Sequence, residues 1–484
     1  MQPVFLLDGS WKNRDFLIHY QYYIIRHRRQ RGEQIVKHYR NETVEARVLP
    51  VEGEYLRTRY QMCDNEVTRI TVGMGEDWTV LACKEVYGKA VKCALELGCE
   101  SCAFDLTPAA QLGKEGIFAA VEGVYGGAYR QKFTLEDRCV PAIACYAEGS
   151  GWTDEDLNRA SALARSILQV RNLVNRPANL LTPEMFGTAL TNMAQQLPVS
   201  VQVYHRDELA ERGLNALLSV GDSSGNAPCM IVMRYNGAPD SDTRLGYVGK
   251  GVTCDTGGYC LKSRQSMAGM KGDMAGGAAV AGALCALAAN GVKVNVTAVI
   301  PACENRISPS SSLPGDLVTS FSGKTIEVLN TDAEGRLLLC DAVTWAIREE
   351  NATHLVDAAT LTGAIYAMLG HVATGVMTND DAWFARLEDA SRQSGERFWK
   401  IPAYPEYERL IESDYADLRN TTKDGCGAIA AGLFIKHFTE DRPWMHLDIA
   451  GTADVNSPVW QHQVSGATGA AASTLYYLAA GMEG

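Results

Sequence analysis

The sequence has no apolar run long enough to cross a membrane. Its longest run, residues 274–289, is made largely of Ala and Gly, and polar Asn290 and Lys293 follow it. A membrane-spanning helix needs about 20 apolar residues, so we expect no membrane partner. A helix buried in an α/β layer is the better interpretation of this run.

The sequence also has fewer basic residues than acidic residues. The chain carries 45 Lys and Arg against 57 Asp and Glu, a formal net charge of −12. Proteins bind the nucleic-acid backbone through clustered Lys and Arg, so this balance argues against nucleic acid as a partner. Residues 20–41 are a basic exception. They could form an interaction arm, but we favour a solvated helix face or an irregular leader.

Histidine and cysteine offer no strong zinc pattern. The nine histidines form neither an HExxH nor an HxH motif, and Cys99 with Cys102 is a lone CxxC. The 14 cysteines are scattered, mostly in apolar runs, and charged residues from Asp8 onward suggest that no secretory segment is present. Unpaired cysteines are typical of the reducing cytoplasm, which is the compartment we predict.

The remaining composition is that of a globular protein. Of 484 residues, 46% are hydrophobic and 21% are charged. These values exclude disorder, collagen and coiled coil for the bulk of the chain. A chain of this length predicts about two to four domains.

Strand-like and helix-like stretches alternate along the chain, which predicts an α/β fold with two domains. We expect a smaller N-terminal α/β domain at 1–150, a linking helix at 151–176 and a larger catalytic domain at 177–484. Short apolar strands separated by helices indicate that the larger domain has a mainly parallel sheet covered by helices on both faces.

The individual elements follow from apolar spacing. In the first domain we expect a helix at 77–97 and a strand at 101–106, and Thr153 with Asp156 forms a capping box for the linking helix. In the catalytic domain we expect strands at 199–204, 230–235, 245–248, 292–300, 326–329, 354–358 and 445–449, and helices at 275–289, 336–348, 382–394 and 467–480.

A glycine-rich segment after the strand at 245–248 carries the first candidate site residues. Lys250 and Asp255 lie there among glycines, at the carboxyl end of a strand, where α/β sheets place their sites. Asp273 stands at the start of the Ala/Gly helix, and for that residue alone a helix N-cap is the preferred interpretation. The spacings of phosphate-binding glycine loops are absent.

The second segment, residues 330–337, also lies between a strand and a helix. Asp332 and Glu334 are two residues apart, so in an extended segment both carboxylates would point the same way. The helix dipole also favours acidic residues at a helix start. That alternative does not account for Arg336 on the same short loop.

Divalent cations would explain both segments, because hard cations prefer oxygen ligands. The carboxylates concerned are those of Asp255, Asp273, Asp332 and Glu334. Two divalent ions would balance their four negative charges. Without metal, close carboxylates would repel one another and their pKa values would rise.

Together these segments resemble those of the leucyl aminopeptidase family of dinuclear metallo-exopeptidases. Residues 330–337, NTDAEGRL, match the family signature at every position, and the glycine-rich segment and the MKGDM stretch at 270–274 match as well. The resemblance covers residues 165–480, including 173–179, 357–364 and 446–451, and is weaker before them. It implies a cytosolic, metal-dependent aminopeptidase that releases apolar, leucine-like N-terminal residues from peptides.

The resemblance also implies a ligand set. One metal would be held by Asp255, Asp332 and Glu334, and the other by Lys250, Asp255, Asp273 and Glu334. The ions would be Mn²⁺ or Zn²⁺, and oxygen-rich ligands also accept Mg²⁺ or Co²⁺. The family assembly is a homohexamer, a dimer of trimers.

Further roles follow from the same resemblance. Lys262 would be the electrophilic lysine, and Arg336 would hold a bicarbonate that serves as general base. The pocket for the first substrate side chain would be lined by Met270, Thr360, Gly363 and Ala453.

The chemistry of peptide hydrolysis suits these roles. A water that bridges two ions forms a hydroxide near neutral pH and can attack the peptide carbonyl. Lys262 would then stabilise the developing oxyanion, and the planar fork of Arg336 suits a small oxyanion. Lys250 must be neutral to bind metal, and a pKa change from about 10.4 to about 7 costs about 4.6 kcal/mol. Without the resemblance, an ion pair of Lys250 with Asp255 would be favoured.

Three residues depart from the family pattern, and three alternatives stay open. Cys254, Thr256 and Leu313 replace a usual aromatic, Ser and Arg, which affects substrate preference and metal affinity rather than reaction class.

The first alternative function is a narrower dipeptidase, for example for cysteinylglycine. The second is a binding or regulatory protein that kept the fold, since some relatives bind DNA. The third is a two-metal phosphoryl-transfer enzyme.

Overall fold

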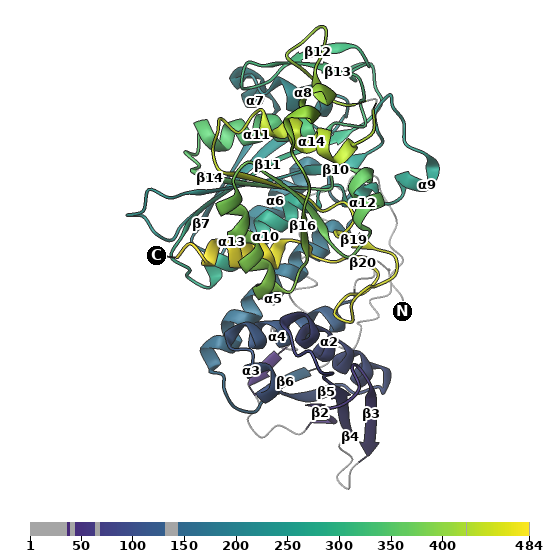
Figure 1. The fold of residues 1–484 in the computed structure, drawn as a ribbon, viewed down its shortest axis with the longest axis vertical. Helices are drawn as coiled ribbons and strands as arrows, with labels where there is room; N and C mark the ends of the chain where they lie inside the picture. The colour runs from purple at the N-terminus through teal and green to yellow at the C-terminus, as the bar shows by residue number, and fades with distance from the viewer. Residues whose placement is uncertain (1–35, 39–43, 63–67, 131–143, 423, 484) are drawn as a thin grey trace, which may run out of the picture.

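The structure is a computed structural model that describes residues 36–38, 44–62, 68–130, 144–422 and 424–483, with the backbone alone for 36–38. Figure 1 shows a smaller N-terminal domain below a larger C-terminal domain, with helix α5 (Asp154–Val174) between them. The basic segment 20–41 lies outside the described residues except for strand β1 (Val36–His38).

The N-terminal domain is a six-stranded sheet in the order β1-β6-β5-β2-β4-β3. Its strands are parallel except for the β3–β4 pair. Besides β1, its elements are β2 (Ala46–Val51), β3 (Thr58–Met62), β4 (Thr68–Gly73), α2 (Val80–Glu96), β5 (Ser101–Asp105), α3 (Thr107–Ala110), α4 (Lys114–Ala128) and β6 (Ala144–Glu148). Thr79 starts α2 by accepting a hydrogen bond from the backbone N–H of Ala82.

The C-terminal domain contains a nine-stranded sheet that is parallel at its centre. Its order is β16-β15-β18-β14-β9-β11-β8-β7, and β10 also pairs with β11. The strands are β7 (Val199–His205), β8 (Cys229–Asn236), β9 (Leu245–Gly249), β10 (Gly251–Asp255), β11 (Asn295–Asn305), β14 (His354–Ala359), β15 (Thr374–Thr378), β16 (Phe398–Lys400) and β18 (Trp444–Asp448). Antiparallel pairs occur towards the two sides, at β11–β8–β7 and at β15–β18.

Helices cover both faces of this sheet, as the sequence predicts. Below it in Figure 1 lie α5, α10 (Ala275–Ala289), α13 (Asp381–Ser394) and α15 (Ala472–Ala480), and above it lie α8 (Asn215–Gly221), α11 (Gly335–Arg348) and α14 (Gly427–Lys436). Each layer has its own buried apolar cluster, one around α10 and one around α11. Burial of apolar side chains on both faces is what holds a parallel sheet in place.

Short elements complete the C-terminal domain. A separate three-stranded sheet contains β12 (Asp316–Thr319), β13 (Thr325–Val328) and β17 (Leu418–Arg419), and a hairpin joins β19 (Asp454–Val455) to β20 (Gly466–Ala467). The remaining helices are η1 (Ala178–Leu180), α6 (Pro183–Ala194), α7 (Arg206–Arg212), α9 (Arg264–Met267), η2 (Met270–Gly272), α12 (Gly363–Leu369) and η3 (Pro405–Ile411).

Most predicted elements are present, with two differences. The strand expected at 326–329 is β13, which belongs to the small sheet rather than to the main one. The helix expected at 467–480 starts only at Ala472, because residues 466–467 pair as β20 and Ala471 has a φ of 66°, a left-handed conformation outside the helical region. The domain boundaries at 150 and 176 stay a prediction.

The structure also tests the predictions made for the linking helix and for the cysteines. Thr153 and Asp156 form the expected capping box at the start of α5. The described cysteines form no disulfide bonds. Most of them are buried, and only Cys254, Cys260 and Cys426 are partly or fully exposed. Within the described ranges, no helix has both the length and the apolar character of a membrane span.

Candidate metal centre

The candidate residues meet where strands of the main sheet end. Strand β10 ends at Asp255, β11 at Asn305 and β18 at Asp448. Ligand sites of α/β sheets lie at the carboxyl ends of parallel strands. The segment that carries Asp332 and Glu334 reaches this edge from the small sheet, just before α11.

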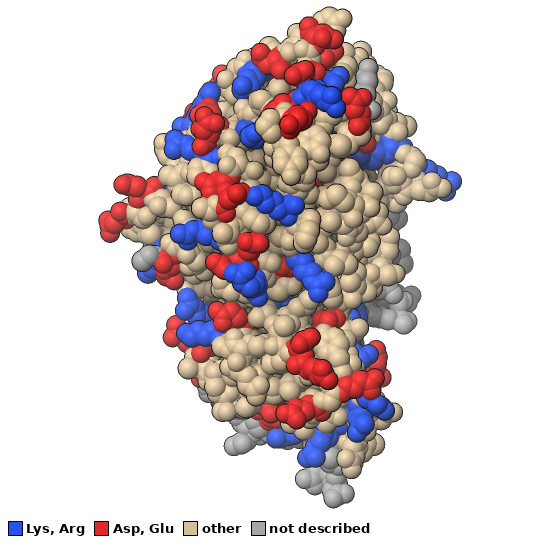
Figure 2. Space-filling view, in the orientation of Figure 1, with Lys and Arg blue, Asp and Glu red and all other residues tan. Residues whose placement is uncertain are grey.

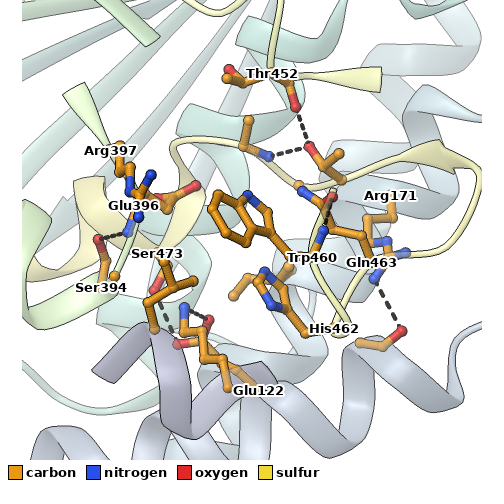
Figure 3. Close-up of a pocket in the computed structure, with 18 of the residues that line it drawn as sticks. Glu122, Arg171, Ser394, Glu396, Arg397, Thr452, Trp460, His462, Gln463 and Ser473 are labelled. Atoms are coloured by element: carbon orange, nitrogen blue, oxygen red, sulfur yellow. Dashed lines mark hydrogen bonds and ion pairs between the residues drawn. The ribbon is translucent and has the colours of Figure 1, made fainter. Parts of the chain in front are cut away.

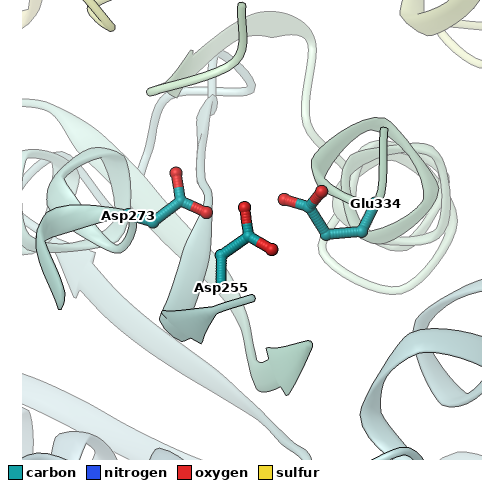
Figure 4. Close-up of side chains that lie close together, drawn as sticks. All are labelled: Asp255, Asp273 and Glu334. Carbon is teal, nitrogen blue, oxygen red and sulfur yellow. The ribbon is translucent and has the colours of Figure 1, made fainter. Parts of the chain in front are cut away.

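Three buried carboxylates form the core of the site. Asp255, Asp273 and Glu334 each provide an oxygen atom, and these atoms all lie within 4.8 Å of one another. Figure 4 shows the three side chains pointing toward one another from separate elements. Among the described residues this is the one group of three or more His, Cys, Asp and Glu side chains close enough to share an ion.

Lys250 lies between two of these carboxylates. Its Nζ is 2.8 Å from Asp273 Oδ1 and 2.8 Å from Glu334 Oε1, and it also donates to the carbonyl of Thr360 at 3.1 Å. Burial favours the neutral amine, but the carboxylates of Asp273, Glu334 and Asp255 outweigh it and raise the pKa of Lys250. From the sequence alone we considered an ion pair of Lys250 with Asp255. In the structure, Lys250 forms its ion pairs with Asp273 and Glu334 instead.

Lys262 joins Asp332 to the core. Its Nζ lies 2.7 Å from Asp255 Oδ2 and also pairs with Asp332. Burial would lower the pKa of Lys262, and the carboxylates of Asp255 and Glu334 raise it. The backbone of Glu334 is helical, with φ −76° and ψ −36°, so the extended segment assumed from the sequence is not what brings Asp332 and Glu334 to one centre.

Asp273 is not the N-cap that its position suggested. The N-cap of α10 is Met274, and no side chain caps this helix. The carboxylate of Asp273 instead accepts hydrogen bonds from Lys250 Nζ and, at 2.7 Å, from Thr360 Oγ1. It therefore faces the candidate centre rather than the helix.

The acidic groups have the properties expected of carboxylates that share a small buried space. Burial raises the pKa of Asp273, Glu334 and Asp332, and repulsion from Asp255 raises each further. The pKa values of these three carboxylates are therefore raised, in the direction predicted from the sequence.

The donor set fits divalent cations. Four carboxylates face two lysines, which leaves two negative charges uncompensated at a site where Asp255, Asp273, Glu334 and Lys250 are all at least 94% buried. Asp273 Oδ2 and Glu334 Oε1 accept no hydrogen bond from the described part of the chain, although each lies 2.8 Å from Lys250 Nζ. Oxygen ligands with free lone pairs and excess negative charge are what hard divalent ions bind.

Arg336 lies beside this centre in the first turn of α11. It is 6% exposed, and its Nε has no hydrogen-bond partner among the described residues. Burial lowers the pKa of Arg336 to about 10, against the attraction of Glu334 and Asp448. A buried guanidinium with a free donor is suited to a small oxyanion.

Two supporting residues were not found by sequence reasoning. Asn305 donates to Asp255 Oδ1 at 2.9 Å. Asp448 accepts from the backbone N–H of Leu361 at 3.1 Å and from Thr362 Oγ1 at 2.7 Å, which fixes the loop that carries Thr360. Both residues end a strand of the main sheet, and that position was the one available signal.

Glycine is required at Gly335 by close packing. A Cβ atom there would lie 2.7 Å from Cε of Lys250, closer than side-chain carbon atoms approach. The glycine in the segment 330–337 thus makes room for the lysine that contacts Glu334.

Of the four expected substrate-lining residues, Thr360 contacts the centre directly, through Asp273 and Lys250. Met270 begins η2, which leads to Asp273, exposed Gly363 begins α12, and Ala453 is 4% exposed between β18 and β19. A common pocket formed by all four stays a prediction.

Comparison with known proteins shows which family this sequence resembles. Residues 169–476 match the model of the cytosol aminopeptidase family, catalytic domain. A "Probable cytosol aminopeptidase" of Clostridium perfringens is 39% identical over 439 residues, which cover 88% of this chain and 89% of the relative. One from Solibacter usitatus is 46% identical over 371 residues, which cover 75% of each chain.

Solved structures agree with the fold. The bottromycin maturation enzyme BotP in complex with Mn has a TM-score of 0.83 and 29% sequence identity, and the match covers 91% of this chain and 99% of BotP. A mutant of tomato leucine aminopeptidase has a TM-score of 0.80 and 29% identity, with 88% of this chain and 84% of the tomato chain covered.

Proposed function

The chain belongs to the cytosol aminopeptidase family of metal-dependent hydrolases, and we propose that it uses two divalent ions to remove apolar, leucine-like residues from the N-termini of peptides. The observation that carries this proposal is the buried cluster of Asp255, Asp273 and Glu334, whose oxygens lie within 4.8 Å of one another. With Asp332 included, four carboxylates face Lys250 and Lys262, and the two negative charges that remain attract divalent ions.

The ligands of the two ions are assigned from the resemblance and from the contacts of the side chains. Asp255, Asp332 and Glu334 would hold one ion, and Lys250, Asp255, Asp273 and Glu334 the other. Mn²⁺ is supported by the oxygen-rich donors and by BotP, whose structure contains Mn, and Zn²⁺ is the alternative. When bound, two such ions polarise the peptide carbonyl and lower the pKa of water toward neutrality.

Lys250 must give up its proton to serve as a ligand. In the metal-free chain Asp273 and Glu334 hold the ammonium form. An ion bound to the same carboxylates removes that stabilisation and repels the ammonium, so the change favours the neutral amine. The hydrogen bonds of Thr360 to Asp273 and Lys250 keep both side chains in place.

Lys262 is positioned to stabilise negative charge during the reaction. Its ammonium group is held by Asp255 and Asp332 and is partly open to solvent, with 14% of the side chain exposed. When those carboxylates bind metal, Lys262 can donate its hydrogen bonds to the oxyanion that develops on the peptide carbonyl. A fixed donor of this kind contributes several kcal/mol to catalysis.

Arg336 would bind the general base. The described carboxylates of the centre are all needed as metal ligands or for Lys262, so a base must come from elsewhere. The free Nε–H of Arg336 can hold bicarbonate, which would accept the proton of the attacking water and pass it to the leaving amine.

The remaining parts of the proposal concern the substrate, the assembly and the compartment. Met270, Thr360, Gly363 and Ala453 would line the pocket for the first side chain of the peptide. By resemblance to the family, the chain would form a homohexamer, a dimer of trimers. The names of its relatives support the cytosol as its compartment.

The rival functions are distinguished by simple comparisons. A dipeptidase would cleave cysteinylglycine but not longer peptides. On the face shown in Figure 2, acidic and basic side chains alternate over both domains, which argues against DNA binding and can be tested by a mobility-shift assay at moderate salt. Phosphoryl transfer would require a phosphate cradle, and the glycine spacings of such loops are absent from the sequence.

The test combines metal analysis with a cleavage panel. Protein loaded with Mn²⁺ or Zn²⁺ should contain two ions per chain and should release the first residue of leucyl amides and leucyl peptides, with N-acetylated peptides as the control. Fewer than two ions, or equal cleavage of blocked peptides, would overturn the proposal.

A further inference from the structure

A second cavity lies between the two domains and is separate from the metal centre. Figure 3 shows side chains from both domains around it. The N-terminal domain contributes Lys84, Glu122 and Tyr125, and α5 contributes Arg171. Polar and apolar side chains share the lining about equally, and the side chains labelled in Figure 3 are mostly polar.

One wall is formed by the segment 456–465 between β19 and β20, which we call the strap. The strap is held against the N-terminal domain: Lys92 Nζ donates to the carbonyl of Gln463 at 2.7 Å, and the N–H of Gln461 donates to Glu85 Oε1 at 3.1 Å. A Cβ on Gly88 would lie 2.8 Å from the backbone N of His462. This close contact brings Trp460 and His462 to the cavity.

The acidic side chains of the cavity already have partners. Glu122 pairs with Lys84 at 2.5 Å and accepts from Ser473 Oγ at 3.0 Å. Glu396 accepts from the backbone N–H of Ala471 at 2.8 Å and from Thr474. Glu122 is therefore neutralised by Lys84, whereas Glu396 has only neutral donors and leaves one negative charge against the cations of Arg171 and Arg397.

The cationic and imidazole groups lack comparable partners. Arg171 is 2% exposed and donates from Nε to the carbonyl of Ala467 at 2.8 Å, but its Nη2 has no hydrogen-bond partner in the described chain. Nδ1 of His462 is also buried and without a partner there. Arg397 stacks on Trp460, with Cζ 5.0 Å from the ring centroid, and forms no ion pair with any described carboxylate.

The surroundings of these groups carry a positive potential. The pKa of Arg171 is lowered to about 10, mainly by burial; Tyr129 opposes this shift and Arg130 contributes to it. Burial also lowers the pKa of Lys92 to about 8, with Arg130 and Arg171 adding to the shift. These shifts place several cations close enough to repel one another beside the cavity.

We propose that the interdomain cavity binds a small oxyanion, of the phosphate or carboxylate class, through the free Nη2 of Arg171 and through His462, whose neutral ring would carry its proton on Nδ1 when the anion is bound. The anion would neutralise the excess positive charge and satisfy two buried donors. Ordered water would satisfy the donors but not the charge. This inference does not depend on the proposed peptidase reaction.

The test is calorimetric titration of the full-length chain, at constant ionic strength, with inorganic phosphate in one arm and acetate in the other. An Arg336→Gln background removes the free guanidinium donor near the metal centre, and EDTA-treated protein removes bound metal. We expect saturable binding of at least one anion at one site per chain and a higher Tm in its presence. Absence of binding by both anions would overturn the proposal.

Two variants locate the site. His462→Leu keeps the volume but removes the donor, and it should weaken binding about 10-fold or more, whereas His462→Asn retains a donor near the Nδ1 position and should restore most of it. Arg397→Gln lies on the exposed rim and should weaken binding a few-fold without loss of folding, which keeps the test valid if His462→Leu is unstable. Arg59→Gln, an exposed arginine on β3, is the charge-matched control. Equal affinities in all variants would contradict the proposal.

Discussion

Lys250 Nζ lies 2.8 Å from Oε1 of Glu334, a buried carboxylate oxygen that accepts no hydrogen bond from the described residues. The lysine thus neutralises part of the charge that a metal ion would neutralise when bound. The proposed metal centre is therefore present in the metal-free chain as a set of ion pairs, and metal binding exchanges one set of charge contacts for another.

Asp332 provides the most direct test of the ligand assignment. Asp332→Asn keeps the shape of the side chain but removes its charge, so bound metal should fall below two ions per chain. Turnover of leucyl amides should fall by about 1000-fold, since metal polarisation is worth several kcal/mol. Metal content and kcat are measured on the same preparation, with Asp316→Asn, an exposed aspartate on β12, as the matched control. Full activity with two ions bound would remove Asp332 from the ligand set.

Replacing Lys262 separates an effect on catalysis from an effect on metal binding. Lys262→Met should lower kcat by about 100- to 1000-fold, the effect of losing one oxyanion donor, while two ions remain bound. Lys293→Met, at an exposed position after α10, is the control. An unchanged kcat would exclude Lys262 from the reaction, and a loss of metal equal to that of Asp332→Asn would make it a structural residue of the site.

Gly335 tests the close packing around Lys250. In Gly335→Ala the added Cβ would lie 2.7 Å from Lys250 Cε and would push the lysine away from Glu334. We expect metal affinity to fall about 10- to 100-fold, the usual effect of disturbing the support of a ligand. Gly225→Ala is the control, because nothing lies within 4 Å of its added Cβ. Identical metal affinity in the two variants would show that Lys250 has no part in metal binding.

The buried pair of His446 and Asp357 predicts a pH dependence of stability. Their Nδ1 and Oδ1 atoms are 2.6 Å apart, and Asp357 raises the pKa of His446 although burial opposes it. The protonated ring stabilises the fold fully below the unfolded-state pKa of about 6.5, and the contribution is lost as pH rises through the higher folded-state value.

Guanidinium unfolding of wild type and His446→Gln checks this expectation. The wild-type advantage in unfolding free energy should decrease as pH rises above about 6.5, the unfolded-state pKa of histidine. His437→Gln removes a histidine that pairs with Glu408 at the surface, with 33% of its side chain exposed, and serves as control. A constant difference between wild type and His446→Gln over this range would contradict the prediction.

The sequence predicts the fold class and the family because these depend on local patterns. Helix α10 begins and ends at the residues expected from its Ala/Gly run, and the motifs around Lys250 and Asp332 are continuous in sequence. Asp273 was harder to interpret, because an acidic residue before a helix usually caps it. Its contacts with Lys250 and Thr360 join residues 23 and 87 positions apart.

The parts that sequence reasoning missed depend on long-range contacts between polar residues. Asn305 contacts Asp255 across 50 residues, and Asp448 contacts Thr362 across 86. The strap reaches the N-terminal domain through Lys92 and Gln463, which are 371 residues apart. Apolar periodicity describes which face of an element is buried but not which distant polar group it meets.

Lys250 and Lys262 compete with any cation for the acidic side chains with which they pair. A monovalent ion would bring no more charge than the ammonium group that it displaces, so the centre discriminates in favour of doubly charged ions.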